Sequence, residues 1–327
     1  MGEIATEGMV ESKPPSGSAA VLPAHGAPRR LVANGRVSGG LEPLAQAQSQ
    51  RSLAWRRLRQ DQFAIAGGVI VLFTLVLALA APLVAPHDPL AQDSSIRLSP
   101  IGTAGHPLGT DGNGRDILSR LIYGSRTALL VATVPVLAAA AIGLIAGLVA
   151  GYRGGWVDAV IMRFADILFA FPAILLAIAI VAALGPRLLN AMMALAIVFI
   201  PAFARLVRAS VLSLRERDFV LAARAGGATP SAIIGRHILV NALPPIIVFA
   251  TLQTGQMIIF ASALSFLGLG VQPPTPDWGS MANDGRNSML VAPWVTTLPG
   301  IAIFAVSVGF NLLGDGLRDA LDPTLRA

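Results

Sequence analysis

Six stretches of this sequence contain no charged residue, and they constrain the fold more than any other feature. They cover residues 63–85, 127–152, 167–184, 188–204, 246–270 and 293–314. A helix rises about 1.5 Å per residue and the hydrocarbon core of a bilayer is about 30 Å thick, so each stretch is long enough, or nearly so, to cross it. The pattern predicts an all-α, polytopic membrane protein with six transmembrane helices.

Composition agrees with this prediction and removes several other classes of protein. Hydrophobic residues make up 54% of the 327 residues, charged residues only 13%, and the mean hydropathy is +0.68, far from the averages of soluble proteins. The chain has no Cys, which excludes disulfides, Cys-ligated zinc, iron–sulfur clusters and a thiol nucleophile. We expect no nucleic-acid partner, because the basic residues are distributed by membrane side.

The distribution of Lys and Arg predicts the topology. With the N-terminus inside, eighteen of the 24 basic residues lie on the cytoplasmic side and six lie outside. Cytoplasmic loops of membrane proteins carry such an excess. We therefore expect both termini in the cytoplasm of a bacterial cell and the protein in its inner (plasma) membrane, in contact with lipid.

These features divide the chain into four parts. Residues 1–60 form a cytoplasmic tail, rich in Pro, Gly and Ser, that we expect to be disordered. Residues 61–125 contain the first span and a long outer loop, and residues 126–315 hold the other five spans. This third part includes a cytoplasmic loop at 213–245, and residues 316–327 are a cytoplasmic tail.

The loop at 213–245 reads as two short helices. Asp218 can cap the first, and Gly226 and Gly227 end it. Thr229 caps the second with Pro230 at its first position, and Pro244–Pro245 close it. A helix pair in the most Arg-rich loop is a candidate docking element for a cytosolic partner.

The same loop resembles the Glu-Ala-Ala loop of importer-type ABC permeases, which inserts into a groove on the ATP-hydrolysing subunit. The resemblance rests on Leu221-Ala222-Ala223, on Gly227 and on Leu239. The sequence departs from the family pattern at Leu221, where the family has Glu, at His237, where it has Ile, and at Val240, where it has Pro. The family's salt bridge through that Glu is therefore in doubt here.

Other motifs extend the resemblance from about Trp55 to the C-terminus. Residues 264–279 (LSFLGLGVQPPTPDWG) and 310–323 resemble runs of the dipeptide, oligopeptide, glutathione and nickel permeases, as do residues 106–116 and 150–158. The resemblance implies the fold of type I ABC importer permeases, with a second permease subunit as heterodimer partner, two ATP-binding subunits and an extracytoplasmic solute-binding protein. The outer loops would face that binding protein, with Trp278 and Trp294 as interfacial anchors.

The sequence itself predicts no catalysis. The only Lys, Lys13, follows Ser12, so the chain lacks a P-loop and is not an enzyme; ATP and Mg²⁺ are expected on the partner subunits. We expect no cofactor on this chain. Of the four His residues, 25 lies in the N-terminal tail, 87 and 106 in the long outer loop and 237 in the cytoplasmic loop, and no two have metal-ligand spacing, which predicts no metal site. His237 is most simply a polar residue of the docking helix.

Polar residues inside the spans are few. Gln253, Gln256 and Asn311 are candidates for a transport path or gate, and helix–helix hydrogen bonding is the alternative for each and for Asn190. Pro172 and Pro201 can kink two spans, Arg163 and Asp166 can pair on one helix face, and Gly143, Gly147 and Gly151 indicate a close helix contact.

Taken together, the residues and the resemblance predict the permease subunit of an ABC importer for di- or oligopeptides or glutathione. The predicted docking residues are Leu221, Ala222, Ala223, Gly227, His237 and Leu239. A nickel or metal-chelate importer is the alternative within the family, since no ligand cluster decides. An ion-coupled carrier would require a mid-membrane carboxylate, and a structural scaffold would not require the Ala222-Ala223-Gly227 core.

Overall fold

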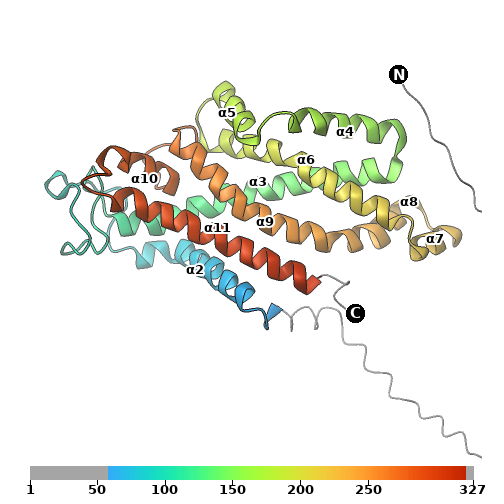
Figure 1. Cartoon of the computed structure of the whole chain (residues 1–327), viewed down its shortest axis with the longest axis horizontal. Coiled ribbons are helices and arrows are strands. Elements are labelled where there is room, and N and C mark those ends of the chain that lie inside the picture. Colours follow the sequence, from blue (N-terminus) through green and yellow to red (C-terminus); the bar gives the residue numbers. More distant parts are fainter. Residues whose placement is uncertain (1–57, 322–327) are drawn as a thin grey trace, which may run out of the picture. The chain divides into compact units, whose positions relative to one another are not determined.

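The computed structural model describes residues 58–321, so most of the predicted N-terminal tail and residues 322–327 lie outside the described part. Within it the chain is helical, with two isolated β-bridges and no longer strand (Figure 1). Five helices are long and apolar enough to cross a membrane: α2 (Gln62–Val84), α3 (Ile117–Arg153), α6 (Leu188–Leu214), a continuous helix at Pro230–Phe266 and α11 (Trp294–Leu321). This all-helical arrangement confirms the predicted fold class.

The predicted third span is a broken helix. It consists of α4 (Gly155–Phe169) and α5 (Ala173–Leu184), whose axes meet at 89°, and the pair makes a sixth span if it crosses as one unit. Pro172 is the N-cap of α5 and has no N–H to continue α4, so the prediction that it distorts this span is confirmed.

The close helix contact predicted from Gly143, Gly147 and Gly151 is confirmed between α3 and α6. A Cβ atom added to Gly143 would lie 2.4 Å from Cβ of Phe203, and one added to Gly147 would lie 2.6 Å from Cβ of Val207. Small residues at four-residue spacing let two helix backbones approach closely where lipid gives no hydrophobic driving force.

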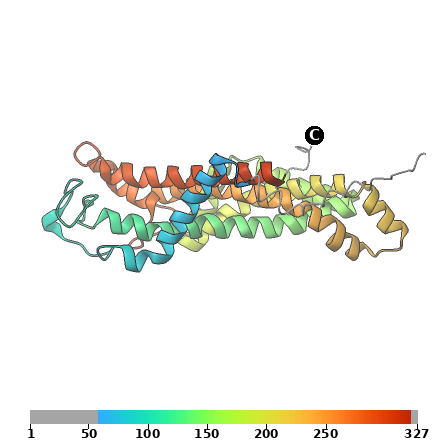
Figure 2. The ribbon, with the colours of Figure 1, turned by 90° about the horizontal axis from the view of Figure 1, so that it is seen from below.

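A second group of helices packs in the same way. Gly67 of α2 lies against the backbone of α11 at Gly309, and Ser307 of α11 donates a hydrogen bond of 2.9 Å to the carbonyl of Gly255 in α9 (Leu239–Phe266). Figure 2 shows α2 crossing its neighbours obliquely. The helices therefore meet through small residues and few polar bonds.

Several helices are longer than their charge-free stretches. α3 begins at Ile117 rather than 127, and α6 continues to Leu214 past the predicted end at 204. Both extensions contain Arg residues that are paired with carboxylates, so charge does not end the helix. α11 likewise continues to Leu321 beyond the predicted end at 314.

The loops gather at opposite ends of the helices (Figure 1). One end carries the long loop after α2, with η1 (Ser94–Ile96), and the segment with α10 (Trp278–Gly285) and η3 (Arg286–Ser288). We call residues 86–120 and 273–292 the outer end, after the side of the membrane that the sequence predicts for them. The other end carries α7 (Asp218–Ala225) and α8 (Pro230–Ala232), and we call residues 213–245 the coupling loop.

Candidate functional site

The first arm of the coupling loop is the short helix α7. Its N-cap is Arg217, with no side-chain capping bond, and Asp218 occupies the first turn, so the predicted cap at Asp218 is wrong by one residue. The carboxylate still lies at the helix end where the backbone dipole favours negative charge. The helix ends at Gly226 as predicted, and Gly227 has φ +80°, a left-handed conformation that glycine adopts without steric cost.

The second arm is one long helix that begins in this loop. Thr229 caps it through a 3.4 Å bond from the Ala232 amide, with Pro230 at the first position, as predicted. It continues through a π-helical segment (η2, Ile233–Ile238) into α9. Pro244 and Pro245 lie inside α9, so the prediction that they close the second helix is wrong.

The helix tolerates these prolines in a segment with irregular hydrogen bonding. The π-helical turns come just before the prolines, and the Asn241 side chain donates a 2.6 Å bond to the carbonyl of His237. Local π-helical adjustments of this kind let membrane helices tolerate prolines, because they re-satisfy backbone groups that the prolines leave free. The coupling loop therefore consists of the short helix α7 and the beginning of a membrane helix, rather than two short helices.

Buried aliphatic side chains hold the two arms together. Val220 of α7 is fully buried, as are Ile233 and Ile238 of the second arm. The rings of Phe219 and His237 lie 6.4 Å apart between centroids, so His237 faces α7. This small apolar core fixes the angle between the arms.

The predicted docking residues divide into exposed and half-buried positions. Leu221, Ala222 and Gly227 are exposed, with 47% of the Leu221 surface accessible, whereas Ala223, His237 and Leu239 are half-buried. Ala225 and Gly226 extend the exposed surface. The arrangement presents an apolar and small-residue surface, to which a second backbone can come close.

Ion pairs connect the base of this loop to its neighbours. Arg208 of α6 forms two bonds with Asp158 of α4, at 2.5 and 2.6 Å, and Arg205 pairs with Asp166 at 2.6 Å. The predicted pairing of Asp166 with Arg163 is therefore wrong, because the carboxylate points to α6. Arg215 also donates to the carbonyl of Gly151 at 3.2 Å. These contacts link α6, immediately before the coupling loop, to α3 and α4.

The three path candidates lie in different environments. Gln253 is 9% exposed, whereas Gln256 and Asn311 are exposed. A Cβ atom added to Gly255 would lie 2.9 Å from Oδ1 of Asn311, so that side chain lies at the α9–α11 contact. Asn190 donates to the carbonyls of Leu184 and Gly185 at the end of α5.

The outer end contains a buried ionic cluster that sequence reasoning missed. Asp111 accepts bonds from Arg115, at 2.7 Å, and from Arg120, and Asp284 of α10 lies 3.3 Å from Arg115. The cluster joins the outer loop, the start of α3 and α10. The motif at residues 106–116 was visible in the sequence, but its partner Asp284 is distant along the chain.

Trp278 is buried rather than interfacial. It is 3% exposed, and its Nε1 donates a 3.0 Å hydrogen bond to the carbonyl of Leu121. Its indole ring packs against Gly124. The prediction of an interfacial anchor is wrong here, because the preceding Asp277 caps α10 and directs the indole toward α3. Burial raises the pKa of Asp277, and the hydrogen bond from the Ser280 amide opposes that shift.

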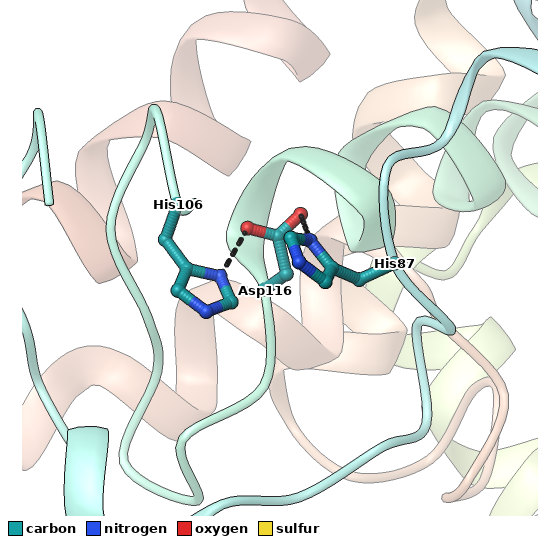
Figure 3. A group of neighbouring side chains, drawn as sticks. All are labelled: His87, His106 and Asp116. Atoms are coloured by element: carbon teal, nitrogen blue, oxygen red, sulfur yellow. Dashed lines mark hydrogen bonds and ion pairs between the residues drawn. The ribbon is translucent and has the colours of Figure 1, made fainter. Parts of the chain in front are cut away.

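Two of the four His residues come together in the fold, although their spacing in the sequence predicted no metal site. His87 and His106 stack with their ring centroids 4.5 Å apart, and both face Asp116, the N-cap of α3 (Figure 3). These three residues are the group in the described part of the chain that could hold a metal ion.

Two family models match separate parts of the chain. Residues 143–327 match the family model described as the binding-protein-dependent transport system inner membrane component. Residues 49–100 match the N-terminal TM domain of oligopeptide transport permease C.

Curated relatives cover most of the chain. The dipeptide transport system permease protein DppC of Alkalihalophilus pseudofirmus is 48% identical over 274 residues, which are 84% of this chain and 90% of the relative. The glutathione transport system permease protein GsiD of Pectobacterium atrosepticum is 46% identical over 84% of this chain and 91% of its own length. GsiD of Escherichia coli O6:K15:H31 is 47% identical over 83% of this chain and 90% of its own.

Proposed function

Because this chain belongs to the family of inner membrane components of binding-protein-dependent transport systems, we propose that it carries di- or oligopeptides, or glutathione, into the cell as one permease subunit of an ABC importer. The family implies an ATPase and a solute-binding protein as partners. The ATPase binds ATP with Mg²⁺ and hydrolyses it, and this chain is the transport component rather than a catalytic subunit.

The observation that carries the proposal is the position of the coupling loop. Helix α7 lies at the end of the helices opposite the outer end (Figure 1), and Leu221 and Ala222 within it and Gly227 just after it are exposed. A partner that binds this surface on one side of the membrane leaves the outer end accessible to a solute-binding protein on the other. This separation is what coupling of ATP hydrolysis to transport requires.

The contacts around the coupling loop indicate how a displacement of the loop can be transmitted to the membrane helices. The second arm is continuous with α9, so displacement of α7 and α8 acts directly on a membrane helix. The pairs Arg208–Asp158 and Arg205–Asp166 connect α6 to α4, and the break at Pro172 lets α5 move separately from α4. We propose that closure of the ATPase subunits moves these helices and exchanges inward- and outward-facing states.

The complete assembly in this proposal contains a second permease as heterodimer partner, two ATP-binding subunits and the binding protein. Both termini face the cytoplasm, consistent with the excess of basic residues on that side. Gln253, Gln256 and Asn311 remain proposed path residues, and the departure at Leu221 replaces an ionic contact with an apolar one at the docking surface.

Uptake measurements test the proposal. A strain lacking the gene is compared with one in which it is restored, using labelled dipeptides, tripeptides, glutathione and Ni²⁺. We expect restoration of ATP-dependent peptide or glutathione uptake. Restored nickel uptake alone would support the metal importer instead, and uptake that survives ATP depletion but follows an ion gradient would contradict the ABC mechanism.

A further inference from the structure

Three side chains from different turns of the chain between α2 and α3 meet at the outer end. Nδ1 of His106 lies 2.9 Å from Oδ1 of Asp116, and Nδ1 of His87 lies 3.8 Å from Oδ2 of the same carboxylate. Figure 3 shows the two imidazoles on either side of Asp116. One ligand atom from each residue lies within 4.8 Å of the other two.

The surrounding backbone positions all three residues. The His87 amide donates a 3.0 Å bond to Oγ of Ser119, which fixes the loop after α2 to the first turn of α3. Asp116 accepts a 2.7 Å bond from the Ser119 amide through Oδ2. The His106 amide donates to the Thr103 carbonyl at 2.8 Å within a tight turn. Secondary contacts of this kind orient the ligands of metal sites.

The donor set suits a divalent transition metal. Two imidazole nitrogens and one carboxylate oxygen form a common three-ligand zinc site, with a fourth position for water. Tetrahedral ligands about 2.0 Å from zinc are about 3.3 Å apart, so the two rings must close slightly around the ion. The Asp116 side chain is fully buried and fixed, whereas the His87 side chain is 39% exposed and has room to move.

A cavity of ≈ 620 Å³ gives access to the cluster. His87 lines it together with Tyr123 and the chain at Pro274, Thr275 and Pro276. An ion can therefore reach His87 from outside without opening the helix bundle. The site lies among loops and at the end of α3, away from the proposed path residues on α9 and α11.

We propose that His87, His106 and Asp116 bind one resident Zn²⁺ ion that joins three segments of the outer end: the loop after α2, the turn at His106 and the start of α3. Without the ion, Nδ1–H of His106 can donate to Oδ1 of Asp116 at 2.9 Å, whereas Nδ1 of His87 lies 3.8 Å from Oδ2, too far for a hydrogen bond. With the ion, both Nδ1 atoms use their lone pairs for the metal, and each ring carries its proton on Nε2. The site is independent of which solute is transported.

The first test is zinc binding by the intact complex, purified in detergent with a histidine-free affinity tag and stripped with EDTA. Equilibrium dialysis against Zn²⁺ is read by elemental analysis for the wild type and the H87A, D116N and H237A variants. Asn at position 116 can still cap α3 but lacks the carboxylate. His237 lies on the coupling loop, so H237A is a matched loss of one histidine.

We expect the wild type and H237A to bind one equivalent of Zn²⁺ more than H87A and D116N, or to bind that equivalent at least tenfold more tightly. Zn²⁺ should raise the Tm of the wild type and H237A and leave that of H87A and D116N unchanged. Equal zinc binding by wild type and H87A would overturn the proposal. Loss of the ion during ATP hydrolysis would mark it as cargo and would also overturn it.

Discussion

The outer end and the coupling loop differ in how their polar and charged residues are satisfied. At the outer end, Asp111, Arg115 and Arg120 are buried and bind one another, and Asp116 and Asp277 each cap a helix. In the coupling loop, Arg217, Arg224 and Arg236 are exposed and the buried residues are aliphatic.

This difference indicates two kinds of surface. The outer end completes most of its own contacts, so it can keep its shape while a binding protein attaches and leaves, as the proposed function requires. The coupling loop has a small apolar core and an exposed face, so a partner can bind there without first breaking buried polar contacts. Stability should therefore depend on the outer end, and coupling to ATP hydrolysis on the loop.

The largest effect is expected from Asp111→Ala. The substitution leaves the buried Arg115 and Arg120 with only the exposed carboxylate of Asp284, and losing one partner of a buried ionic group typically costs about 3–5 kcal/mol. Arg224→Ala is the matched change at an exposed charge of the coupling loop, where we expect less than about 0.5 kcal/mol. Denaturation of the purified complex measures both, and equal losses would contradict the proposed division.

The next largest difference in stability is expected between Ala substitutions at two glycines, one in each region. Gly114 and Gly227 both have positive φ, +73° and +80°. A Cβ atom added to Gly114 would lie 1.8 Å from the Asp93 carbonyl oxygen, whereas a Cβ atom added to Gly227 would have no other atom within 4 Å. Ala at 227 should cost about 1–2 kcal/mol through backbone strain alone. Ala at 114 should cost more, because the outer loop must also move.

Substitutions at Gly227 should also affect transport. Gly227→Val should abolish transport while the protein remains in the membrane, because a β-branched residue disfavours this conformation and changes the angle between the loop's arms. Gly227→Asn tolerates a left-handed backbone better and should retain more transport. Uptake and membrane content are measured together, and full transport by the Val variant would remove the loop's assigned role.

A smaller effect is expected from Trp278→Phe. The ring remains packed against Gly124, but the hydrogen bond to Leu121 is lost, which should lower the free energy of unfolding by about 1 kcal/mol. Trp156→Phe is the control, since Trp156 is 77% exposed. Equal changes in Tm for the two variants would show that the buried indole bond does not stabilise the outer end.

Hydrophobic patterning located the membrane helices but not all of their ends. Charge-free stretches predict where a chain can enter lipid, and α2 agrees closely with its stretch. α3 extends further because Arg120 is paired with Asp111 of the preceding loop, and α6 extends further because Arg205 and Arg208 are paired with carboxylates of α4, which is distant in the sequence. Such pairs are invisible in a local window, as is the continuity of α9 through Pro244 and Pro245.

The same limit explains the missed residues at the outer end. His87 and His106 meet because Ser119 fixes one loop and Asp116 begins α3 beneath the other. The local turn chemistry at Gly226, Gly227, Thr229 and Pro230 was predictable because it depends on neighbours in sequence. Contacts between loops depend on the completed fold.

Site-specific cross-linking tests the central claim, docking of the coupling loop on the ATPase. The chain contains no Cys, so Ala222→Cys introduces a unique thiol at an exposed docking position, and Thr275→Cys introduces one at the exposed outer end. A maleimide photo-cross-linker is attached in the assembled complex, whose ATP-binding subunits are depleted of reactive Cys. We expect an adduct with an ATP-binding subunit from position 222 whose yield changes with ATP, and none from position 275. Absence of that adduct at 222, or equal yield from both positions, would contradict the account.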